Sequence, residues 1–199
     1  MICIIDYGAG NLRSVQKAVE FVGGEAVVTD DVAAIENADR IIFPGVGAFG
    51  KAMAAIDQRA LRSSITDFIT AGKPFLGICL GLQLLFEESE EDPGVRGLSV
   101  LKGTVKRFSP KLKVPHLGWN VLIQVVSCPL WKNIPDSSYF YFAHSYYISP
   151  DDNSVVVGVS DYGMAVPVAI RKNNLYGLQF HPEKSQKVGL QILKNFVSI

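Results

Sequence analysis

Cysteine is scarce in this chain, and its three cysteines, Cys3, Cys79 and Cys128, lie far apart. None belongs to a Cys-x-x-Cys pair, so the spacing indicates neither a zinc site nor a disulfide framework. There is no Asn-x-Ser/Thr acceptor site, and the first residues run directly into an apolar strand without a basic leader. We therefore expect no metal and a reducing, cytoplasmic environment.

The chain also lacks an excess of charge of either sign, because 19 basic and 19 acidic residues among 199 cancel. Nothing in that balance favours nucleic acid or a membrane surface as a partner. The apolar runs stay far below the roughly 20 residues that a membrane-spanning helix needs. Repeats, linkers and low-complexity segments are absent too, so we expect one domain over residues 1–199, with small molecules or another protein as partners.

Short apolar runs and helical patterns alternate in the first half. Strands are expected at Met1–Ile5, Glu25–Thr29, Arg40–Phe43 and Phe75–Ile78, and a helical pattern runs from Lys51 to Ala71. The second half has short β-rich segments at 103–108, 121–126, 139–144, 155–160, 166–171 and 175–180, and then a closing amphipathic helix over 185–198. These patterns predict an α/β protein with an open, mainly parallel, doubly wound sheet, helices on both faces and an antiparallel β extension.

The stretch Lys73–Phe86 is the one around which the chain is organised. Gly77 and Gly81 stand two positions on either side of Cys79, the spacing that lets a strand-to-helix elbow hold a nucleophile in a strained turn. There the thiol would face the positive end of the following helix, which favours the thiolate. The amide of Leu80 would be free to stabilise an oxyanion. The alternative is a small buried cysteine without a chemical role.

A thiol nucleophile needs a base, and the base needs an acceptor that orients it. His181 and Glu183 are two residues apart behind a strand, so on an extended segment they project the same way. Pro182 between them fixes φ and limits their movement. His116 and His144 have no carboxylate two or three residues away, and for them a structural, hydrogen-bonded role is favoured.

Two glycine-rich turns and an acidic run complete the pattern. Pro44–Phe49 follows a strand, at the edge where open α/β sheets place ligands, and could complete the oxyanion hole; a plain tight turn is the alternative. Asp6–Gly10 lacks the third glycine of a dinucleotide fingerprint and the Gly-Lys-Ser/Thr of a P-loop, so no cofactor is expected. The acidic run Glu87–Asp92 is interpreted as a solvated helix end, although one carboxylate could hold a substrate ammonium.

The cysteine motif at 77–83 and the Phe-His-Pro-Glu motif at 180–183 resemble the class I (triad) glutamine amidotransferases. Further motifs at 6–12, 44–49, 115–120, 142–146 and 181–185 resemble the glutaminase subunits of imidazole glycerol phosphate synthases. The resemblance implies that Cys79 attacks the side-chain amide of glutamine and forms a thioester, with His181 as acid/base and Glu183 as its orienter. Ammonia would then pass to a cyclase subunit, a (β/α)8 barrel, which forms imidazole glycerol phosphate and aminoimidazole carboxamide ribotide in histidine biosynthesis.

The same resemblance implies roles for further residues and no cofactor. The oxyanion hole would be formed at Val46, Gly47 and Leu80. The glutamine pocket would be lined by Gly47, Gln83, Glu91, Ser145 and Tyr146. The cyclase, in a heterodimer, would face Asn11, Leu117, Trp119, Tyr141 and Lys184. Leu117 stands where relatives often carry methionine, a near-isosteric change that should matter little.

The Pro44–Gly47 turn suggests a gate. If the N–H of Val46 must point at the oxyanion, the flanking glycines make a peptide flip cheap, whereas Val46 itself resists a positive φ. We therefore hypothesise that the isolated subunit keeps this amide turned away and hydrolyses glutamine slowly until the partner's site is filled.

Three other readings stay open. The chain could be an amidotransferase subunit of a pyridoxal phosphate or chorismate pathway, although the motifs at 115–120 and 181–185 argue against it. It could be a hydrolase that acts alone on γ-glutamyl compounds. It could also be a non-catalytic binding module of the same fold, against which the intact Cys79, His181 and Glu183 count.

Overall fold

Strands and helices alternate through the first half of the chain, and strands dominate the second. The computed structural model describes residues 1–199. In chain order the strands are β1 (Ile2–Ile5), β2 (Ala26–Thr29), β3 (Arg40–Gly45), β4 (Phe75–Cys79), β5 (Glu88–Ser89), β6 (Gly103–Arg107), β7 (His116–Gln124), β8 (Ser138–His144), β9 (Tyr146–Pro150), β10 (Val156–Asp161), β11 (Ala165–Lys172) and β12 (Leu175–Leu178). The helices are α1 (Leu12–Phe21), α2 (Val32–Asn37), α3 (Phe49–Gln58), α4 (Leu61–Thr70), α5 (Leu80–Gln83) and α6 (Gln186–Val197), and short 3-10 segments span Pro129–Trp131, Asn153–Val155 and Pro182–Lys184. No helix is both long and apolar enough to cross a membrane.

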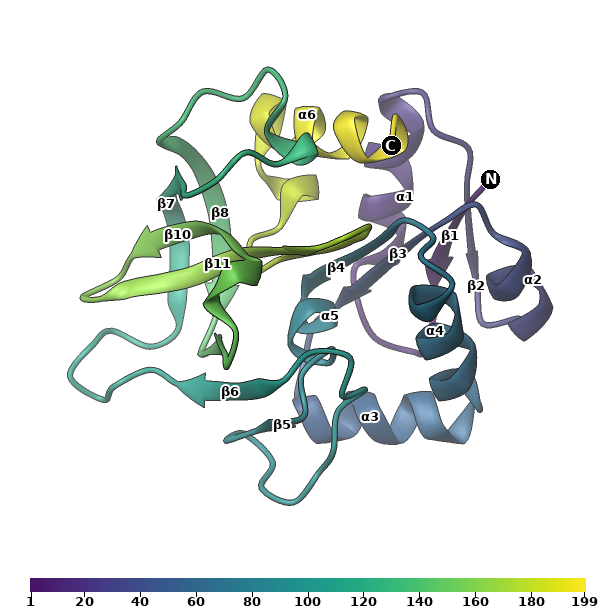
Figure 1. Cartoon of the computed structure of the whole chain (residues 1–199), viewed down its shortest axis with the longest axis horizontal. Helices are drawn as coiled ribbons and strands as arrows, with labels where there is room; N and C mark the ends of the chain where they lie inside the picture. The colour runs from purple at the N-terminus through teal and green to yellow at the C-terminus, as the bar shows by residue number, and fades with distance from the viewer.

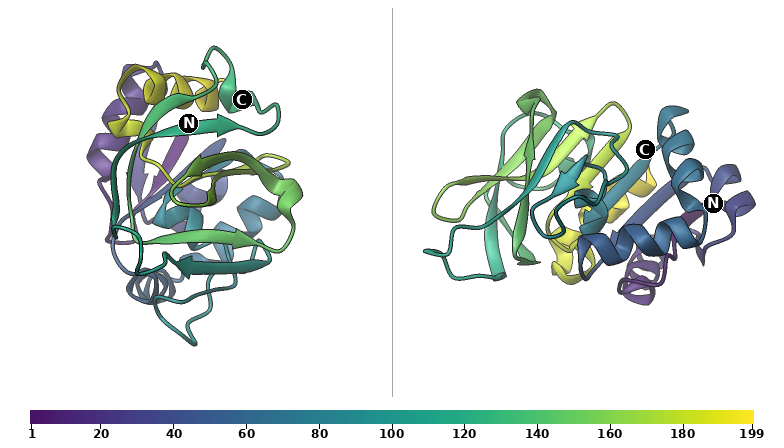
Figure 2. Two further views of the ribbon diagram at one scale, coloured as in Figure 1. Left: turned by 90° about the vertical axis from the view of Figure 1, so that its left-hand side faces the viewer. Right: turned by 90° about the horizontal axis from the view of Figure 1, so that it is seen from below.

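The main sheet has nine strands in the order β2-β1-β3-β4-β12-β11-β10-β7-β8. The strands from β2 to β12 pair in parallel, and those from β12 to β8 pair antiparallel. Figure 2 shows the antiparallel strands gathered at one end of the molecule and the parallel strands with α1 to α4 at the other. A smaller sheet, β5-β6-β9, lies beside the main one (Figure 1).

The two faces of the parallel strands bury two separate apolar cores. Side chains of a strand point alternately to either face, and β1 accordingly sends Ile2 and Ile4 into the core that contains α1 and α6. It sends Cys3 and Ile5 into the core that contains α2, α3 and α4. Figure 1 shows these two groups of helices on opposite sides of the sheet. The predicted doubly wound sheet with an antiparallel extension is confirmed.

Several predicted boundaries are wrong. The helical patterns expected from Lys51 to Ala71 correspond to α3 and α4, but α3 begins at Phe49 and the two helices are separated at Ala60, which adopts a left-handed conformation with φ 55°. The strand expected at 121–126 is longer at its start and shorter at its end, since β7 spans His116–Gln124. Helix α2, strand β5 and strand β9 were not predicted. The helix after the cysteine is the single turn α5, too short for a sizeable helix dipole to act on the thiol.

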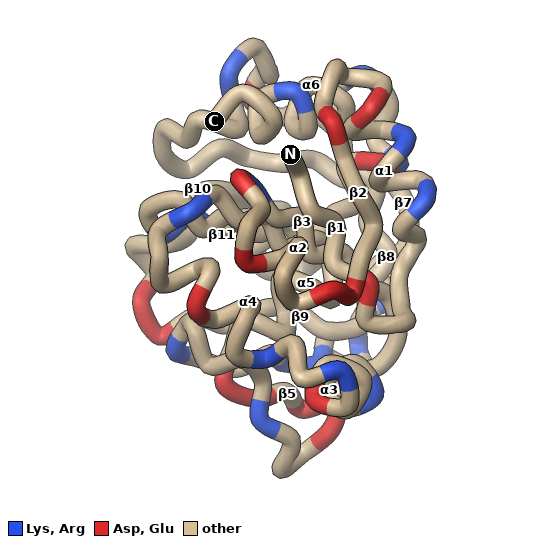
Figure 3. The backbone as a smooth tube through the Cα atoms, turned by 90° about the vertical axis from the view of Figure 1, so that its right-hand side faces the viewer, with Lys and Arg blue, Asp and Glu red and all other residues tan.

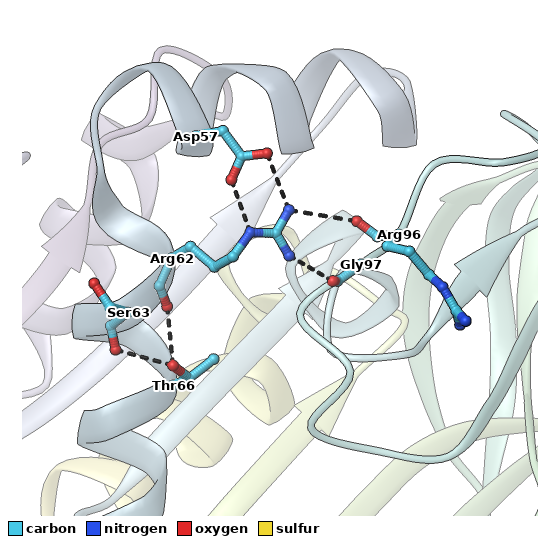
Figure 4. Close-up of polar contacts among 6 residues, drawn as sticks. All are labelled: Asp57, Arg62, Ser63, Thr66, Arg96 and Gly97. Atoms are coloured by element: carbon cyan, nitrogen blue, oxygen red, sulfur yellow. Dashed lines mark hydrogen bonds and ion pairs between the residues drawn. The ribbon is translucent and has the colours of Figure 1, made fainter.

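Basic and acidic residues are interspersed along the backbone in the view of Figure 3, and their numbers are equal. One of them fastens α4 to a loop (Figure 4). Arg62 donates two hydrogen bonds to the carboxylate of Asp57, at 2.8 and 3.0 Å, and a third to the carbonyl of Gly97, at 2.7 Å. The hydrogen bond from Arg62 lowers the pKa of Asp57. Arg62 thereby holds the end of the loop that contains the acidic run.

The glycines around Cys79 are explained by backbone contact. A Cβ on Gly81 would overlap the carbonyl oxygen of Phe43 in β3, so α5 lies directly against that strand. A Cβ on Gly77 would lie 2.9 Å from the carbonyl oxygen of Gly81. Only glycine allows backbones to approach this closely.

Substituting Gly81→Ala should therefore lower the free energy of unfolding by about 3 kcal/mol or more, because neither backbone can yield cheaply. The matched control is Gly72→Ala, where φ is +74° and the added methyl meets open space. It should cost only about 1 kcal/mol, for the left-handed backbone. Urea denaturation of both variants measures the difference, and equal losses would contradict the close packing of α5 on β3.

Candidate active site

Cys79 sits at the carboxyl end of β4 in a strained backbone conformation, with φ 54° and ψ −110°. A positive φ is uncommon for a residue with a Cβ, and such strain marks nucleophile elbows. The thiol is 6% exposed and lines a cavity of about 240 Å³. Its sulfur lies 3.9 Å from the carbonyl oxygen of Ala143 on β8. Cys79 is therefore buried but opens onto this cavity, which neither Cys3 nor Cys128 borders.

His181 and Glu183 stand beside the thiol. The Nδ1 atom of His181 is 2.9 Å from Oε1 of Glu183, and both side chains are almost fully buried. The ring lies close enough to Cys79 for that side chain to act on the pKa of His181. Burial acts to lower the pKa of His181, but the hydrogen bonds and charges of Cys79 and Glu183 together raise it above its ordinary 6.5. The three side chains form one chain of contacts in which both neighbours of His181 favour its protonated form.

The backbone that carries His181 is tied to β8 and α6. Its amide donates to the carbonyl of Tyr141 at 2.9 Å. The hydroxyl of Ser185 donates to the carbonyl of His181 at 2.7 Å and accepts from the amide of Tyr141 at 3.0 Å. Gly189 in α6 lets that helix lie against Pro182, since a Cβ there would overlap the Pro182 carbonyl oxygen. The ring is therefore fixed from both sides.

The structure gathers the predicted glutamine-pocket residues around the same cavity. It is lined by Val46, Gly47, Cys79, Leu80, Gln83, Glu91, Pro115, Leu117, Ala143, His144, Ser145 and Tyr146. All five residues predicted for the pocket and all three predicted for the oxyanion hole are in this set. A volume of 240 Å³ lies below the range typical of drug-sized ligands and suits a single amino acid.

The candidate oxyanion turn lies next to the nucleophile, because Gly45 at the end of β3 is paired in register with Cys79. Val46 is 42% exposed, and Gly47 has φ +107° with open space around it. The hydroxyl of Tyr7 is fully buried without a hydrogen-bond partner, and a Cβ on Gly45 would overlap it. Sequence reasoning missed Tyr7, which lies within the Asp6–Gly10 turn motif.

The hypothesis that the Val46 amide acts as a gate stays a prediction.

The acidic run is not the end of a helix, so that prediction is wrong. Glu91 accepts the amide of Phe49 at 2.9 Å, and Asp92 accepts the amide of Gly50 at 2.7 Å. These carboxylates cap the first turn of α3, whose amides have no partner within the helix. Glu91 also borders the cavity, so it remains available to a ligand ammonium group.

Gln179 is a site residue that the sequence did not reveal. It is fully buried, and its Nε2 lies 3.7 Å from the Cys79 sulfur. Its Oε1 accepts from Nε2 of Gln83 at 3.1 Å, and the same Gln83 nitrogen donates to the carbonyl of Tyr146 at 3.0 Å. A glutamine within the apolar run before His181 was the available signal.

The residues predicted to face a partner lie on the outer surface. Leu117 and Trp119 on β7 are 63% and 47% exposed. Trp119 is paired across the strands with Tyr141, their rings edge to face, and the ammonium of Lys184 lies 5.8 Å from the Tyr141 ring centroid. Asn11 is exposed at the start of α1, which contacts the Pro182–Lys184 segment.

Comparison with known proteins agrees with this geometry. The family model described as glutamine amidotransferase class-I matches residues 3–199. The chain belongs to this family. Among solved structures, one described as a glutamine amidotransferase superposes with a TM-score of 0.79 at 18% identity, and the match covers 100% of both chains. PurLQS from Thermotoga maritima gives 0.76 at 20% identity and covers 99% of this chain and 97% of that one.

Relatives with higher sequence identity show to which group of class-I amidotransferases the chain belongs. A protein of Bacillus cereus strain G9842 is 50% identical, over 100% of this chain and 95% of its own length. One from Methanothermobacter thermautotrophicus is 52% identical, over 100% and 98%. Both are named imidazole glycerol phosphate synthase subunit HisH. The chain therefore groups with the HisH amidotransferases, and the resemblance seen in the sequence is confirmed.

The raised pKa of His181 predicts a pH-dependent effect of Glu183→Gln. A group whose folded pKa exceeds its unfolded value stabilises the fold below the unfolded pKa, and this contribution is lost as the pH rises through the folded pKa. Glu183→Gln removes one cause of the increase, so it should cost about 1 kcal/mol or more near pH 6 and less near pH 10. Urea denaturation at both pH values measures this. Glu20→Gln, on the exposed side of α1, is the control and should show no such trend.

Proposed function

We propose that this chain is the glutaminase subunit of an imidazole glycerol phosphate synthase, acting through Cys79, His181 and Glu183. The observation that carries the proposal is the contact chain from Glu183 through His181 to the strained Cys79 at an amino-acid-sized cavity. An imidazolium beside the sulfur favours the thiolate, which is the attacking species.

In the proposed reaction the Cys79 sulfur attacks the side-chain carbonyl carbon of glutamine and forms a tetrahedral intermediate. Its oxyanion is stabilised by backbone amides at Val46, Gly47 and Leu80. His181 gives its proton to the departing nitrogen, so that ammonia leaves and a glutamyl thioester remains. His181 then takes a proton from water, which attacks the thioester and releases glutamate and the free thiol. Glu183 keeps the imidazole oriented throughout.

Glutamine would be held at both of its ends. The carboxylate of Glu91 would receive the substrate ammonium group, as an opposite charge at the rim of the cavity. Gln83, Ser145 and Tyr146 would position the remainder of the substrate. The proposed chemistry needs no cofactor.

The partner in this proposal is a cyclase subunit that takes up the ammonia, with which the chain forms a heterodimer in the cytoplasm. The chain itself would be one domain over residues 1–199. Exposed Leu117 and Trp119 form an apolar outer face, with Tyr141, Lys184 and Asn11 around it. Aromatic residues and an adjacent cation are typical of protein interfaces. The names of the relatives, each a synthase subunit, support such a partner.

Replacing the nucleophile tests the reaction. Cys79→Ser should lower kcat for glutamate release by about a thousand-fold or more, because the thiolate is lost while the pocket is kept. The matched control is Cys128→Ala, a buried cysteine outside this cavity, which should keep its activity. Substantial turnover by Cys79→Ser would overturn the proposal.

Adding the cyclase subunit tests the hypothesis that the Val46 amide is turned away in the isolated chain. If the Val46 amide is turned away in the free chain, glutamine turnover should rise about a hundred-fold when the cyclase with its nucleotide substrate is added, since one oxyanion donor contributes that much. Steady-state glutamate release with and without the liganded cyclase measures it. Equal rates would contradict the gate and would favour a hydrolase that acts alone.

The same assay tests whether the outer face formed by Leu117 and Trp119 binds the cyclase. Trp119→Ala should raise the cyclase concentration needed for half-maximal stimulation. Val126→Ala removes an equally exposed side chain that borders a different surface hollow, and it should leave that concentration unchanged. The same shift in both variants would argue against this face.

A further inference from the structure

Two buried histidines that the proposed reaction does not use hydrogen-bond each other; His144 borders the cavity, and His116 lies behind it. His116 on β7 and His144 on β8 are directly opposite in the antiparallel ladder, and Nδ1 of His116 is 3.0 Å from Nε2 of His144. They are 4% and 6% exposed. The pair belongs to two sequence motifs for which only a structural role was favoured.

Each proton in this contact can be assigned from its neighbours. Nδ1 of His144 is 2.7 Å from the carbonyl oxygen of Tyr146, which can only accept, so Nδ1 of His144 carries the proton. In a neutral ring its Nε2 is then an acceptor, and Nδ1 of His116 must donate to it. The remaining His116 nitrogen, Nε2, is therefore an acceptor as well.

The hydrogen bonds of Asn120, on the far side of His116, independently indicate the same His116 tautomer. The amide of Asn120 is fixed, because its Nδ2 donates to the carbonyl of Asp161 at 2.9 Å and its Oδ1 accepts from the amide of Val121 at 2.8 Å. The second proton of Nδ2 points at Nε2 of His116, 3.2 Å away. Burial, the main cause, lowers the pKa of both rings, of His116 to about 4 and of His144 to about 3. Both rings are neutral Nδ1–H tautomers near neutral pH.

This one-way chain of hydrogen bonds ends at the wall of the cavity. The carbonyl of Tyr146 that receives the His144 proton also accepts from Gln83, whose second amide proton goes to Gln179 beside the Cys79 sulfur. Tyr146 and its neighbour Ser145 both border the cavity. Each ring and amide nitrogen from Asn120 to this wall thus has an assigned role as donor or acceptor.

Strand β7, where this series of hydrogen bonds starts, has an inward and an outward face. His116 and Asn120 point inward from β7, whereas Leu117 and Trp119 between them are exposed. The same five-residue span therefore contains Leu117 and Trp119 of the proposed docking face and the start of the hydrogen-bond chain. A shift of β7 along its ladder would move both together, since the strand backbone is continuous.

We propose that His116 is a positioning residue that, through His144, holds the Ser145–Tyr146 wall of the glutamine cavity in register with β7. This inference rests on the proposed glutaminase function for its kinetic test, but not for its spectroscopic one. His116 does not border the cavity and touches no substrate. Its effect is on substrate binding and not on the chemical step.

The spectroscopic test needs no variant and no substrate. Long-range ¹H–¹⁵N correlation spectra of the whole chain at neutral pH distinguish the two histidine tautomers. We expect His116 and His144 both to carry the proton on Nδ1, with Nε2 unprotonated. A proton on Nε2 of either ring, or a charged ring, would overturn the assignment whatever the chain does with glutamine.

The kinetic test uses two substitutions with opposite effects on packing and on hydrogen bonding. The His116 ring is stacked between Phe142 and Tyr162, with centroids 4.7 and 4.0 Å away. His116→Phe keeps this stacking but removes the donor to His144. His116→Asn loses the stacking, but its Nδ2 takes the place of the ring Nδ1 and can still donate.

In the complex with saturating cyclase, His116→Phe should raise KM for glutamine about ten-fold with kcat little changed, because an unpaired buried acceptor loosens the wall. His116→Asn should keep KM within about three-fold of the parent, although its Tm falls further. A packing role alone predicts the reverse order, and that order would overturn the proposal. Phe108→Leu, which packs on both rings without a hydrogen bond, should lower Tm and leave KM unchanged.

Failure of this inference can be told from failure of the proposed function. If the parent chain with its cyclase releases no glutamate, the proposed function is wrong and the tautomers alone decide the role of His116. If the parent is active and both His116 variants have the parental KM, only the inference is wrong.

Discussion

The parallel pairing of β4 with β3 on one side and β12 on the other is the constraint on which the rest of the site depends. Parallel strands end at the same edge of a sheet, so residues that follow them meet whatever their separation in the chain. Gly45 pairs with Cys79, and Leu178 pairs with Ile78. The glycine turn, the nucleophile and the segment that leads to His181 are thereby brought to one edge. A slip of one residue in either pairing would turn the side chains to the opposite face.

The sequence predicted the parts of the site that depend on local geometry. The glycines around Cys79 and the spacing of His181 and Glu183 reflect contacts within a few residues, and from them the sequence predicted a nucleophile and its base. The alternation of apolar runs predicted the two-faced sheet in the same way. The parts it did not predict depend on residues distant in the chain: the acidic run caps a helix 42 positions earlier, and Gln179 meets a sulfur 100 positions away. No local pattern encodes such a contact.

Stability and function oppose each other around Cys79. Four buried side-chain nitrogen or oxygen atoms of the chain have no hydrogen-bond partner, and two of them, the hydroxyl of Tyr7 and Oε2 of Glu183, lie at this site. Each such atom typically costs about 1–3 kcal/mol. The positive φ of Cys79 adds backbone strain. These costs are concentrated where a nucleophile must be exposed to a ligand, and the two apolar cores on either side of the sheet offset them.

The capping of α3 by Glu91 has a mechanical consequence for the turn before that helix. At its front the turn is anchored by the ladder between Gly45 and Cys79, and at its back by the Glu91 carboxylate on the amide of Phe49. Only Val46, Gly47 and Ala48 lie between the two anchors. Any rearrangement there is confined to a three-residue bridge with fixed ends, so it must be a rotation of individual peptide planes and not a swing of the whole loop. A cation that arrives in the cavity would pull on the rear anchor itself.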